Sequence, residues 1–181
     1  RSASGPQAAI IDGSGAADAV ISFVNGENRL AVIDGFTLTG GSGHPVSIDD
    51  TRGGGVYCRD SSPIIRNNII RNNRAINSVG GGVSVDLGLG PLPPPESIAP
   101  ILEGNLFENN SAELGGGLAI YWGDSIVTGN IFRGNAAETD GGGMFISMGR
   151  GSPTIEWNQL WENQAGDHGG GIVAVNTQFA T

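Results

Sequence analysis

The chain has 181 residues, which suits a single domain, and its 18 acidic residues against nine arginines and no lysine give a formal net charge of −9. No basic stripe can neutralise phosphates and no run of 18 apolar residues occurs, so we expect neither nucleic-acid binding nor membrane insertion. Cys58 is the only cysteine, which excludes an intrachain disulfide, and 32 glycines without a Gly-X-Y period do not make a collagen.

Residues 1–52 predict the first and loosest coils of a repeated structure. Short apolar runs at 10–11, 20–23 and 32–38 are interrupted by glycines and polar residues. Such runs are typical of short strands separated by turns. The segment Ser42–Arg52 then lengthens the first glycine-rich corner.

A block of the form Asn-x-[Ile/Phe/Leu]-x-x-Asn-x-Ala recurs four times in the regular part of the chain, residues 53–181. Its first asparagines are Asn68, Asn105, Asn130 and Asn158, its second are Asn73, Asn110, Asn135 and Asn163, and its alanines are Ala75, Ala112, Ala137 and Ala165. A triple glycine follows each block and another begins at Gly53, and the triplets start 26 to 35 residues apart. Self-similarity at such a period indicates a repeat architecture.

Aligned on the first asparagine, the repeats share apolar columns. The clearest are Ile65, Leu102, Val127 and Ile155; Ile70, Phe107, Phe132 and Leu160; and Val83, Leu118, Met144 and Ile172. Apolar and polar residues alternate with a period of two, which indicates short strands with one inward face, and no segment has helical periodicity. We therefore predict an all-β fold: one parallel β-helix domain over 1–181, with about five to six coils stacked about 4.8 Å apart.

Asparagine, glycine and alanine define the predicted corners. Asparagine tolerates left-handed backbone angles and its amide can bond to neighbouring coils, so both asparagine columns predict amide ladders. The glycine triplets predict sharp corners where a Cβ would clash, and the alanine column predicts a tight interior corner. The proline-rich segment 88–96 must loop out, because proline cannot donate a ladder hydrogen bond.

These features resemble the right-handed parallel β-helix repeat family of the pectate-lyase-like superfamily. The resemblance rests on runs such as IDGFTLTGG, GGGVYCRDSSPIIRNNIIRNN and SPTIEWNQLWEN. It is closest to the repeat regions of large bacterial surface and secreted proteins, which implies a right-handed coil and an extracellular or bacterial cell-surface location. It implies no single activity, because this scaffold carries lyases, hydrolases, adhesins and passive stalks.

Enzymes of this superfamily need clustered carboxylates together with a basic side chain or a histidine. In this chain His44, Asp49 and Asp50 lie in the lengthened first corner, whereas Asp167 and His168 lie in the last corner. These two groups are about four coils, or about 19 Å, apart, so they cannot act on one bond. We therefore predict no catalytic residues and expect no turnover of polyuronates or neutral polysaccharides.

Acidic residues recur at the corner before the triple glycines. They are Asp50, Glu113, Glu138, Asp140 and Asp167. Stacked carboxylates together with backbone carbonyl oxygens would hold Ca²⁺, so these residues are the metal candidates and no other cofactor is expected. The alternative interpretation is a solvated turn that binds no metal.

Five aromatic residues are candidates for contact with a glycan or a protein partner: Tyr57, Tyr121, Trp122, Trp157 and Trp161. Exposed flat rings on a rigid sheet can stack on sugar faces or pack against another chain. The alternative interpretation is that these rings pack beneath the loops.

The two ends of the predicted β-helix suggest a function. Neither Arg1–Gln7 nor Thr177–Thr181 reads as a capping element, and an open strand edge recruits other chains. The apolar edge residues are Ile10, Ile11, Ile172, Val173 and Val175. The leading hypothesis is a non-catalytic extracellular structural scaffold that associates end to end into a filament or forms part of a larger surface protein. The alternative is a β-helix module that binds or cleaves carbohydrates.

Overall fold

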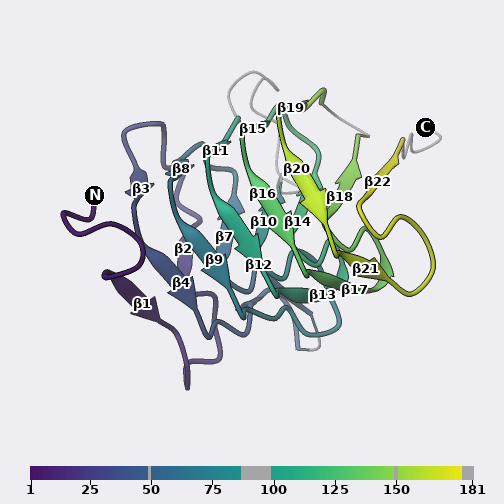
Figure 1. The fold of residues 1–181 in the computed structure, drawn as a ribbon, viewed down its shortest axis with the longest axis horizontal. Helices are drawn as coiled ribbons and strands as arrows, with labels where there is room; N and C mark the ends of the chain where they lie inside the picture. The colour runs from purple at the N-terminus through teal and green to yellow at the C-terminus, as the bar shows by residue number, and fades with distance from the viewer. Residues whose placement is uncertain (49, 87–98, 149–150, 177–181) are drawn as a thin grey trace.

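The computed structural model describes residues 1–48, 50–86, 99–148 and 151–176, and these residues form strands and turns without a helix. Successive coils stack in chain order from one end of the molecule to the other as a parallel β-solenoid (Figure 1). Two of its sheets hold six strands each, so the predicted all-β fold and its number of coils are confirmed. None of the described segments could cross a membrane as a helix.

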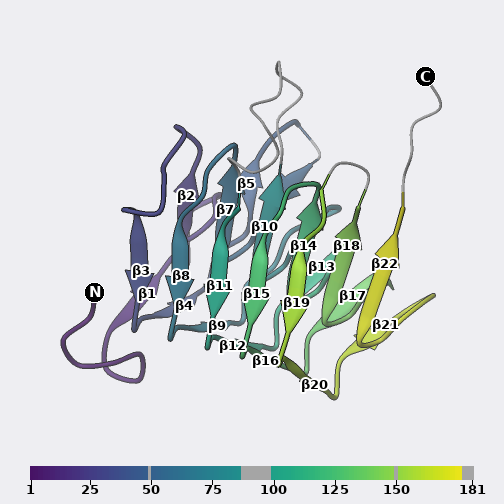
Figure 2. The same ribbon diagram turned by 90° about the horizontal axis from the view of Figure 1, so that it is seen from above.

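Three parallel sheets run along the solenoid (Figure 2). The first sheet contains β1 (Ile10–Asp12), β4 (Thr37–Thr39), β9 (Ile69–Arg71), β12 (Leu106–Glu108), β16 (Ile131–Arg133) and β20 (Gln159–Trp161). The second contains β2 (Ile21–Phe23), β7 (Val56–Arg59), β10 (Val83–Asp86), β14 (Leu118–Tyr121), β18 (Met144–Ser147) and β22 (Ile172–Val175). The third contains β3 (Val32–Asp34), β8 (Ile64–Arg66), β11 (Ile101–Glu103), β15 (Ile126–Thr128) and β19 (Thr154–Glu156).

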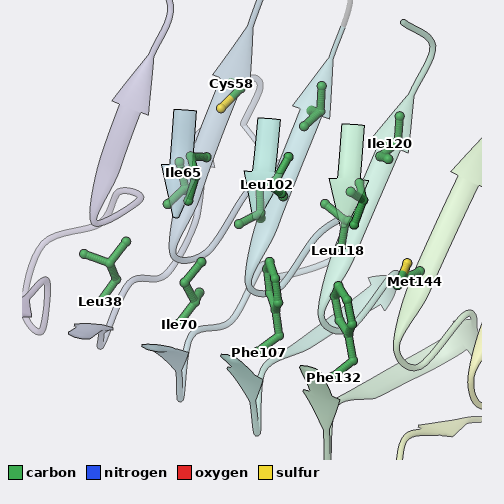
Figure 3. Close-up of a cluster of buried hydrophobic side chains, with 14 of the residues drawn as sticks. Leu38, Cys58, Ile65, Ile70, Leu102, Phe107, Leu118, Ile120, Phe132 and Met144 are labelled. Atoms are coloured by element: carbon green, nitrogen blue, oxygen red, sulfur yellow. The ribbon is translucent and has the colours of Figure 1, made fainter. Parts of the chain in front are cut away.

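The inward columns expected from the sequence pack into one continuous core (Figure 3). In the first sheet Phe107 pairs in register with Ile70 on one side and Phe132 on the other, and all three are fully buried. Leu102 and Leu118 close the core from the third and second sheets. Each coil adds only a few inward side chains, so it depends on its neighbours for burial.

Both predicted asparagine ladders are confirmed. In the first, the Asn68 amide donates to Asn105 Oδ1 at 3.1 Å, and the Asn105 amide donates to Asn130 Oδ1 at 3.0 Å. The same Oδ1 atoms also accept the backbone N–H of the preceding asparagine, at 2.9–3.0 Å. The second ladder joins Asn73, Asn110, Asn135 and Asn163 in the same way.

The triple glycines allow close approach between coils at the corner before the second sheet. A Cβ on Gly116 would collide with the carbonyl oxygens of Ala136 and Gly142 in the next coil. The preceding Gly115 has a φ of +64°, a left-handed conformation that favours glycine. The predicted need for glycine at these corners is therefore confirmed.

The alanine column differs from the predicted interior corner. Ala112, Ala137 and Ala165 lie in a fourth, short parallel sheet, and Ala112 pairs in register with Ala137. The strands of this sheet are β13 (Ser111–Leu114), β17 (Ala136–Asp140) and β21 (Gln164–Ala165). The extended backbone gives their N–H and C=O groups ladder partners that a turn would leave unpaired.

The two predicted insertions have different outcomes. Within Ser42–Arg52, β5 (His44–Pro45) and β6 (Thr51–Arg52) pair as an antiparallel hairpin. The proline-rich segment 88–96 lies outside the described residues, so its predicted looping out of the stack stays a prediction.

Candidate functional site

The first candidate region lies on the outer face of the second sheet, beside the β5–β6 hairpin. Tyr57 on β7 and Asp86 on β10 alternate with inward core residues, so they point away from the core. Arg52 ends β6, Tyr121 ends β14 and His44 begins β5. We call these five residues the outer-face cluster.

Arg52 is the centre of the outer-face cluster. Its guanidinium contacts Asp86 Oδ2 and lies 3.5 Å from Asp50 Oδ2. The hydroxyl of Tyr57 also donates a hydrogen bond to Asp86 Oδ2, at 3.3 Å. Asp86 is only 5% exposed, so these two donors stabilise its carboxyl in place of water.

Aromatic rings flank these polar groups on both sides. The His44 ring stacks on Tyr57 with a centroid separation of 5.0 Å, and His44 Nδ1 lies 2.8 Å from Asp18 Oδ1. On the other side the Arg52 guanidinium lies over the Tyr121 ring, 5.8 Å from its centroid, which is a cation–π arrangement. The hairpin is thus attached to the sheet by charge, hydrogen bonding and ring contact.

Burial shifts the pKa of several groups in the outer-face cluster. It raises the pKa of the Asp86 carboxyl, although the neighbouring Arg52 charge opposes that shift. It also raises the pKa of Tyr121 to about 12, and the pKa of Tyr57 rises for the same reason. Burial disfavours the charge of Arg52, but the Asp86 carboxylate outweighs it and the pKa of Arg52 is raised. Both phenols are therefore neutral and Arg52 is charged near neutral pH.

The arrangement is suited to anchoring the hairpin. A general acid–base pair needs carboxyl groups that reach a substrate, but Asp86 is buried against Arg52 and Asp50 shares the same guanidinium. Sequence reasoning named Asp50 and Tyr57 and missed Arg52 and Asp86. The sequence could have indicated Asp86. When the repeats are aligned on their triple glycines, Asp86 falls in the same outward column as the candidate Tyr121.

Changing Asp86 to asparagine is expected to remove one component of the pH dependence of stability. Because the pKa of Asp86 is raised, the folded protein holds this proton more tightly than the unfolded chain does. The stability that Asp86 contributes is fully present below the ordinary aspartate pKa of 3.8. It is lost as the pH rises through the raised pKa of the folded protein. The wild-type free energy of unfolding, relative to that of D86N, should therefore fall with rising pH in the acid range.

Asp34→Asn is the matched control, because Asp34 should change the pH dependence of stability in the opposite direction. Hydrogen bonds from Asn67 Nδ2 at 3.0 Å and Arg66 Nε at 3.1 Å hold the pKa of Asp34 below its usual value. Its contribution is present above pH 3.8 and is lost as the pH falls through the lowered value. Urea unfolding between about pH 3 and pH 7 measures both slopes, and slopes of the same sign would contradict the assignment.

The second candidate region is the C-terminal coil, formed by β19, β20, β21 and β22. Ile172 on β22 is 43% exposed, although its register partner Met144 in the preceding coil is fully buried. Leu160 on β20 is likewise only partly buried, whereas Phe132 beside it is fully buried. Among the described residues, nothing therefore covers the inward columns at this end, and the edge residues Val173 and Val175 are only partly buried. The prediction that Thr177–Thr181 forms no cap lies outside the described residues.

Both asparagine ladders also reach this coil. The Oδ1 atoms of Asn158 and Asn163 accept hydrogen bonds from the asparagines of the preceding coil, Asn130 and Asn135. In that preceding coil the backbone N–H and one amide hydrogen of each asparagine donate to the next coil. For the same donors of Asn158 and Asn163, the described residues provide no acceptor.

The N-terminal end differs in part from the expectation. Ile10 on β1 is 55% exposed and Ile11 is partly buried, so this strand edge is open as expected. The preceding segment, however, reaches the end of β3 in the third sheet, where the backbone N–H of Ser2 donates to Asp34 O at 2.9 Å (Figure 2). The expectation that Arg1–Gln7 leaves this end uncovered is therefore wrong at Asp34, the last residue of β3, where a carbonyl oxygen at the sheet edge accepts a donor from this segment.

The acidic candidates for calcium do not gather in the described part of the chain. Three of the five are paired with basic side chains: Asp50 with Arg52, Glu138 with Arg74 and Asp140 with His168. Among the described residues, no group of three or more histidine, cysteine, aspartate or glutamate side chains is close enough to hold a metal ion. Calcium binding by Asp50, Glu113, Glu138, Asp140 or Asp167 stays a prediction.

The aromatic candidates separate into buried and exposed rings. Tyr57 is 1% exposed beneath His44, so the prediction of an exposed contact ring is wrong there and the alternative of packing under a loop applies. Tyr121 and Trp122 are half-buried. Trp157 is 84% exposed and Trp161 is 39% exposed, and both belong to the C-terminal coil.

A family model described as a right-handed β-helix region matches residues 32–181. The chain belongs to this right-handed β-helix family. The handedness implied by the sequence resemblance is thereby confirmed. No curated protein and no solved structure matches the chain. Membership of the right-handed β-helix family specifies the fold, and function has to be argued from the two regions described above.

Proposed function

We propose that this right-handed β-helix protein is a non-catalytic extracellular scaffold, secreted or on a bacterial cell surface, whose stack is continued by another β-helical coil. One observation carries the proposal: the inward column is open at the C-terminal coil, where Ile172 is 43% exposed. An exposed strand edge beside an open apolar core recruits another strand.

The contact that would be continued is the one that already joins the coils. Met144 at the start of β18 donates its backbone N–H to Gly171 O of the following coil, at 2.9 Å. Ile172 holds the equivalent position on β22, so its N–H points toward a coil that would follow. The end-to-end association of copies expected from the sequence would place β22 of one copy beside β2 of the next, and a β-helical coil of another protein is the other form that this continuation could take.

The outer-face cluster supports a scaffold over an enzyme. Its one carboxyl, that of Asp86, is held by Arg52 and Tyr57, so it is not free to exchange a proton with a substrate. The cluster instead fixes the β5–β6 hairpin onto the outside of the second sheet.

Carbohydrate binding is the second candidate function, and Trp157 favours it. This residue is 84% exposed and has a φ of +58°, at a corner where the other ladder coils carry Asn67, Gly104 or Gly129. A left-handed conformation costs a bulky residue roughly 1–2 kcal/mol. A strained, exposed ring is a typical feature of a contact site, and a sugar face is one partner for such a ring.

One experiment on the full chain separates these functions. A copy of residues 154–175 is appended after Thr181, so that six residues separate it from Val175, as six separate Ser147 from Thr154. We expect hydrogen exchange of the β22 amides to slow by about 100-fold, because they would lie inside a stack. Ile172→Pro should abolish the protection, whereas the matched control Ile172→Ala, which keeps the N–H, should retain most of it.

The contradicting outcomes are specific. If the β22 amides exchange as fast with the appended coil as without it, the C-terminal coil is not a stacking surface. Saturable binding of a soluble neutral polysaccharide to the wild type, lost in Trp157→Ala, would favour the second candidate function instead.

A further inference from the structure

The asparagine ladders are directional, and this direction restricts what can follow the C-terminal coil. At each ladder step, the Oδ1 atom of the later asparagine accepts two donors of the earlier one, as Asn135 Oδ1 does from the backbone N–H and the amide of Asn110, both at 3.0 Å. The amide of the later asparagine donates back to a carbonyl oxygen of an earlier coil, as Asn135 Nδ2 does to Phe107 O at 3.0 Å. An asparagine therefore bonds to the coils on both sides.

Both ladders end at the C-terminal coil, where the last two asparagines have hydrogen-bond donors that point toward the next coil position. Asn158 and Asn163 supply the accepting oxygens for the preceding coil, and their amides donate back to Val127 O and Phe132 O at 2.8 and 2.9 Å. Each of these asparagines is left with a backbone N–H and a second amide hydrogen that have no acceptor among the described residues. Four donors at two corners thus face the coil that would follow.

The chain's own first coil offers no asparagine to meet them. Thr37 N donates to Ala9 O just as Leu106 N donates to Asn68 O, so Ala9 occupies the first ladder position in that coil. The corner after β1 holds Gly13 and Ser14, and neither carries an amide. The segment that bonds to Asp34 also occupies the end of β3 in the third sheet.

From this mismatch we infer that the C-terminal coil selects a β-helical partner coil carrying two asparagines five residues apart, and that it discriminates against the first coil of a second copy. The inference rests on the proposed function, because it assumes that a coil stacks at this end. The occupant follows from continuity with the coil–coil contact inside the molecule, where an asparagine supplies both the acceptor oxygen and the amide that donates back. Alanine at the first position would leave the two donors of Asn158 unmet.

Two versions of the extended chain test this inference. One carries the appended copy of residues 154–175 unchanged, and the other carries the same copy with its two asparagines replaced by alanine. The readout is hydrogen exchange of the backbone amides of Asn158 and Asn163, which are the ladder donors. We expect at least tenfold slower exchange at these two amides with the asparagine-bearing coil than with the alanine-bearing coil. The Asn110 amide, inside the stack, should be equally protected in both and so reports that each version is folded.

Each outcome decides between the two proposals. Equal protection of Asn158 and Asn163 in both versions would overturn the asparagine selection while leaving coil stacking intact. Protection in neither version would contradict the proposed function itself. Sedimentation of the unextended wild type gives the remaining check: we expect a monomer, and end-to-end association of wild-type copies would overturn the discrimination against the first coil.

Discussion

Replacing Asn110 by alanine is expected to lower the free energy of unfolding by about 4 kcal/mol. Asn110 is fully buried, and its Oδ1 accepts the backbone N–H and the amide of Asn73, both at 3.1 Å. Its amide donates to Ile70 O at 2.8 Å and to Asn135 Oδ1 at 3.0 Å. Alanine would orphan two buried donors on Asn73, and each unsatisfied buried polar group costs about 1–3 kcal/mol.

Asn163→Ala is the matched control, since this asparagine belongs to the same ladder but lies in the C-terminal coil. It also accepts the backbone N–H and the amide of the asparagine before it, Asn135. Its corner is only partly buried, so water can reach the groups that the substitution orphans. We expect a loss of no more than about half that of N110A, measured by urea unfolding. Equal losses would mean that the ladder contributes through side-chain volume and not through buried hydrogen bonds.

The sequence predicted the interior of the solenoid well because the interior is periodic. Once asparagines recur five residues apart and a triple glycine follows, the register of neighbouring coils is determined, and Phe107 has to lie beside Ile70 and Phe132. The two ladders follow from the same spacing. A column of aligned repeat positions shows whether a side chain points inward or outward, and this does not depend on the conformation of the loops.

The outer-face cluster could not be predicted in this way, since it depends on a segment that does not repeat. Alternation along β7 shows that Tyr57 points outward, but the hairpin that places His44 over its ring comes from Ser42–Arg52, which has no counterpart in the other coils. An outward residue was therefore mistaken for an exposed one. Arg52 was missed for the same reason, because only the folded hairpin brings it to Asp86.

The alanine column shows a different limit of the pattern. Small residues before a glycine triplet are compatible with a corner and with a strand, and the repeat does not distinguish them. The backbone hydrogen bonds decide in favour of the strand: Ala75 N donates to Ser111 O at 3.0 Å, and Ala112 pairs with Ala137 in the next coil. Unpaired backbone groups at this buried column would be costly, so the chain stays extended.

Replacing Phe107 by alanine is expected to lower the free energy of unfolding by about 3–5 kcal/mol, the range for truncating a buried phenylalanine. The ring is fully buried and stacks on Phe132, with centroids 4.3 Å apart and planes inclined by 8° (Figure 3). A solenoid coil is held by its neighbours, so the cavity would weaken the contacts on both of its sides. Urea unfolding of the purified variant measures the loss, and a value below about 1 kcal/mol would mean that the site collapses around the smaller side chain.

Phe107→Leu separates loss of volume from loss of the ring. The same column carries Ile70 in the preceding coil and Leu160 two coils later, so an aliphatic side chain suits this position. We expect F107L to cost less than about 1.5 kcal/mol, as a swap that nearly preserves volume. A double-mutant cycle of F107L with F132L then isolates the contact between the rings, for which about 0.5–1.5 kcal/mol is expected. A coupling energy near zero would assign the whole effect of F107A to the cavity, because the rings would then contribute only the volume that they fill.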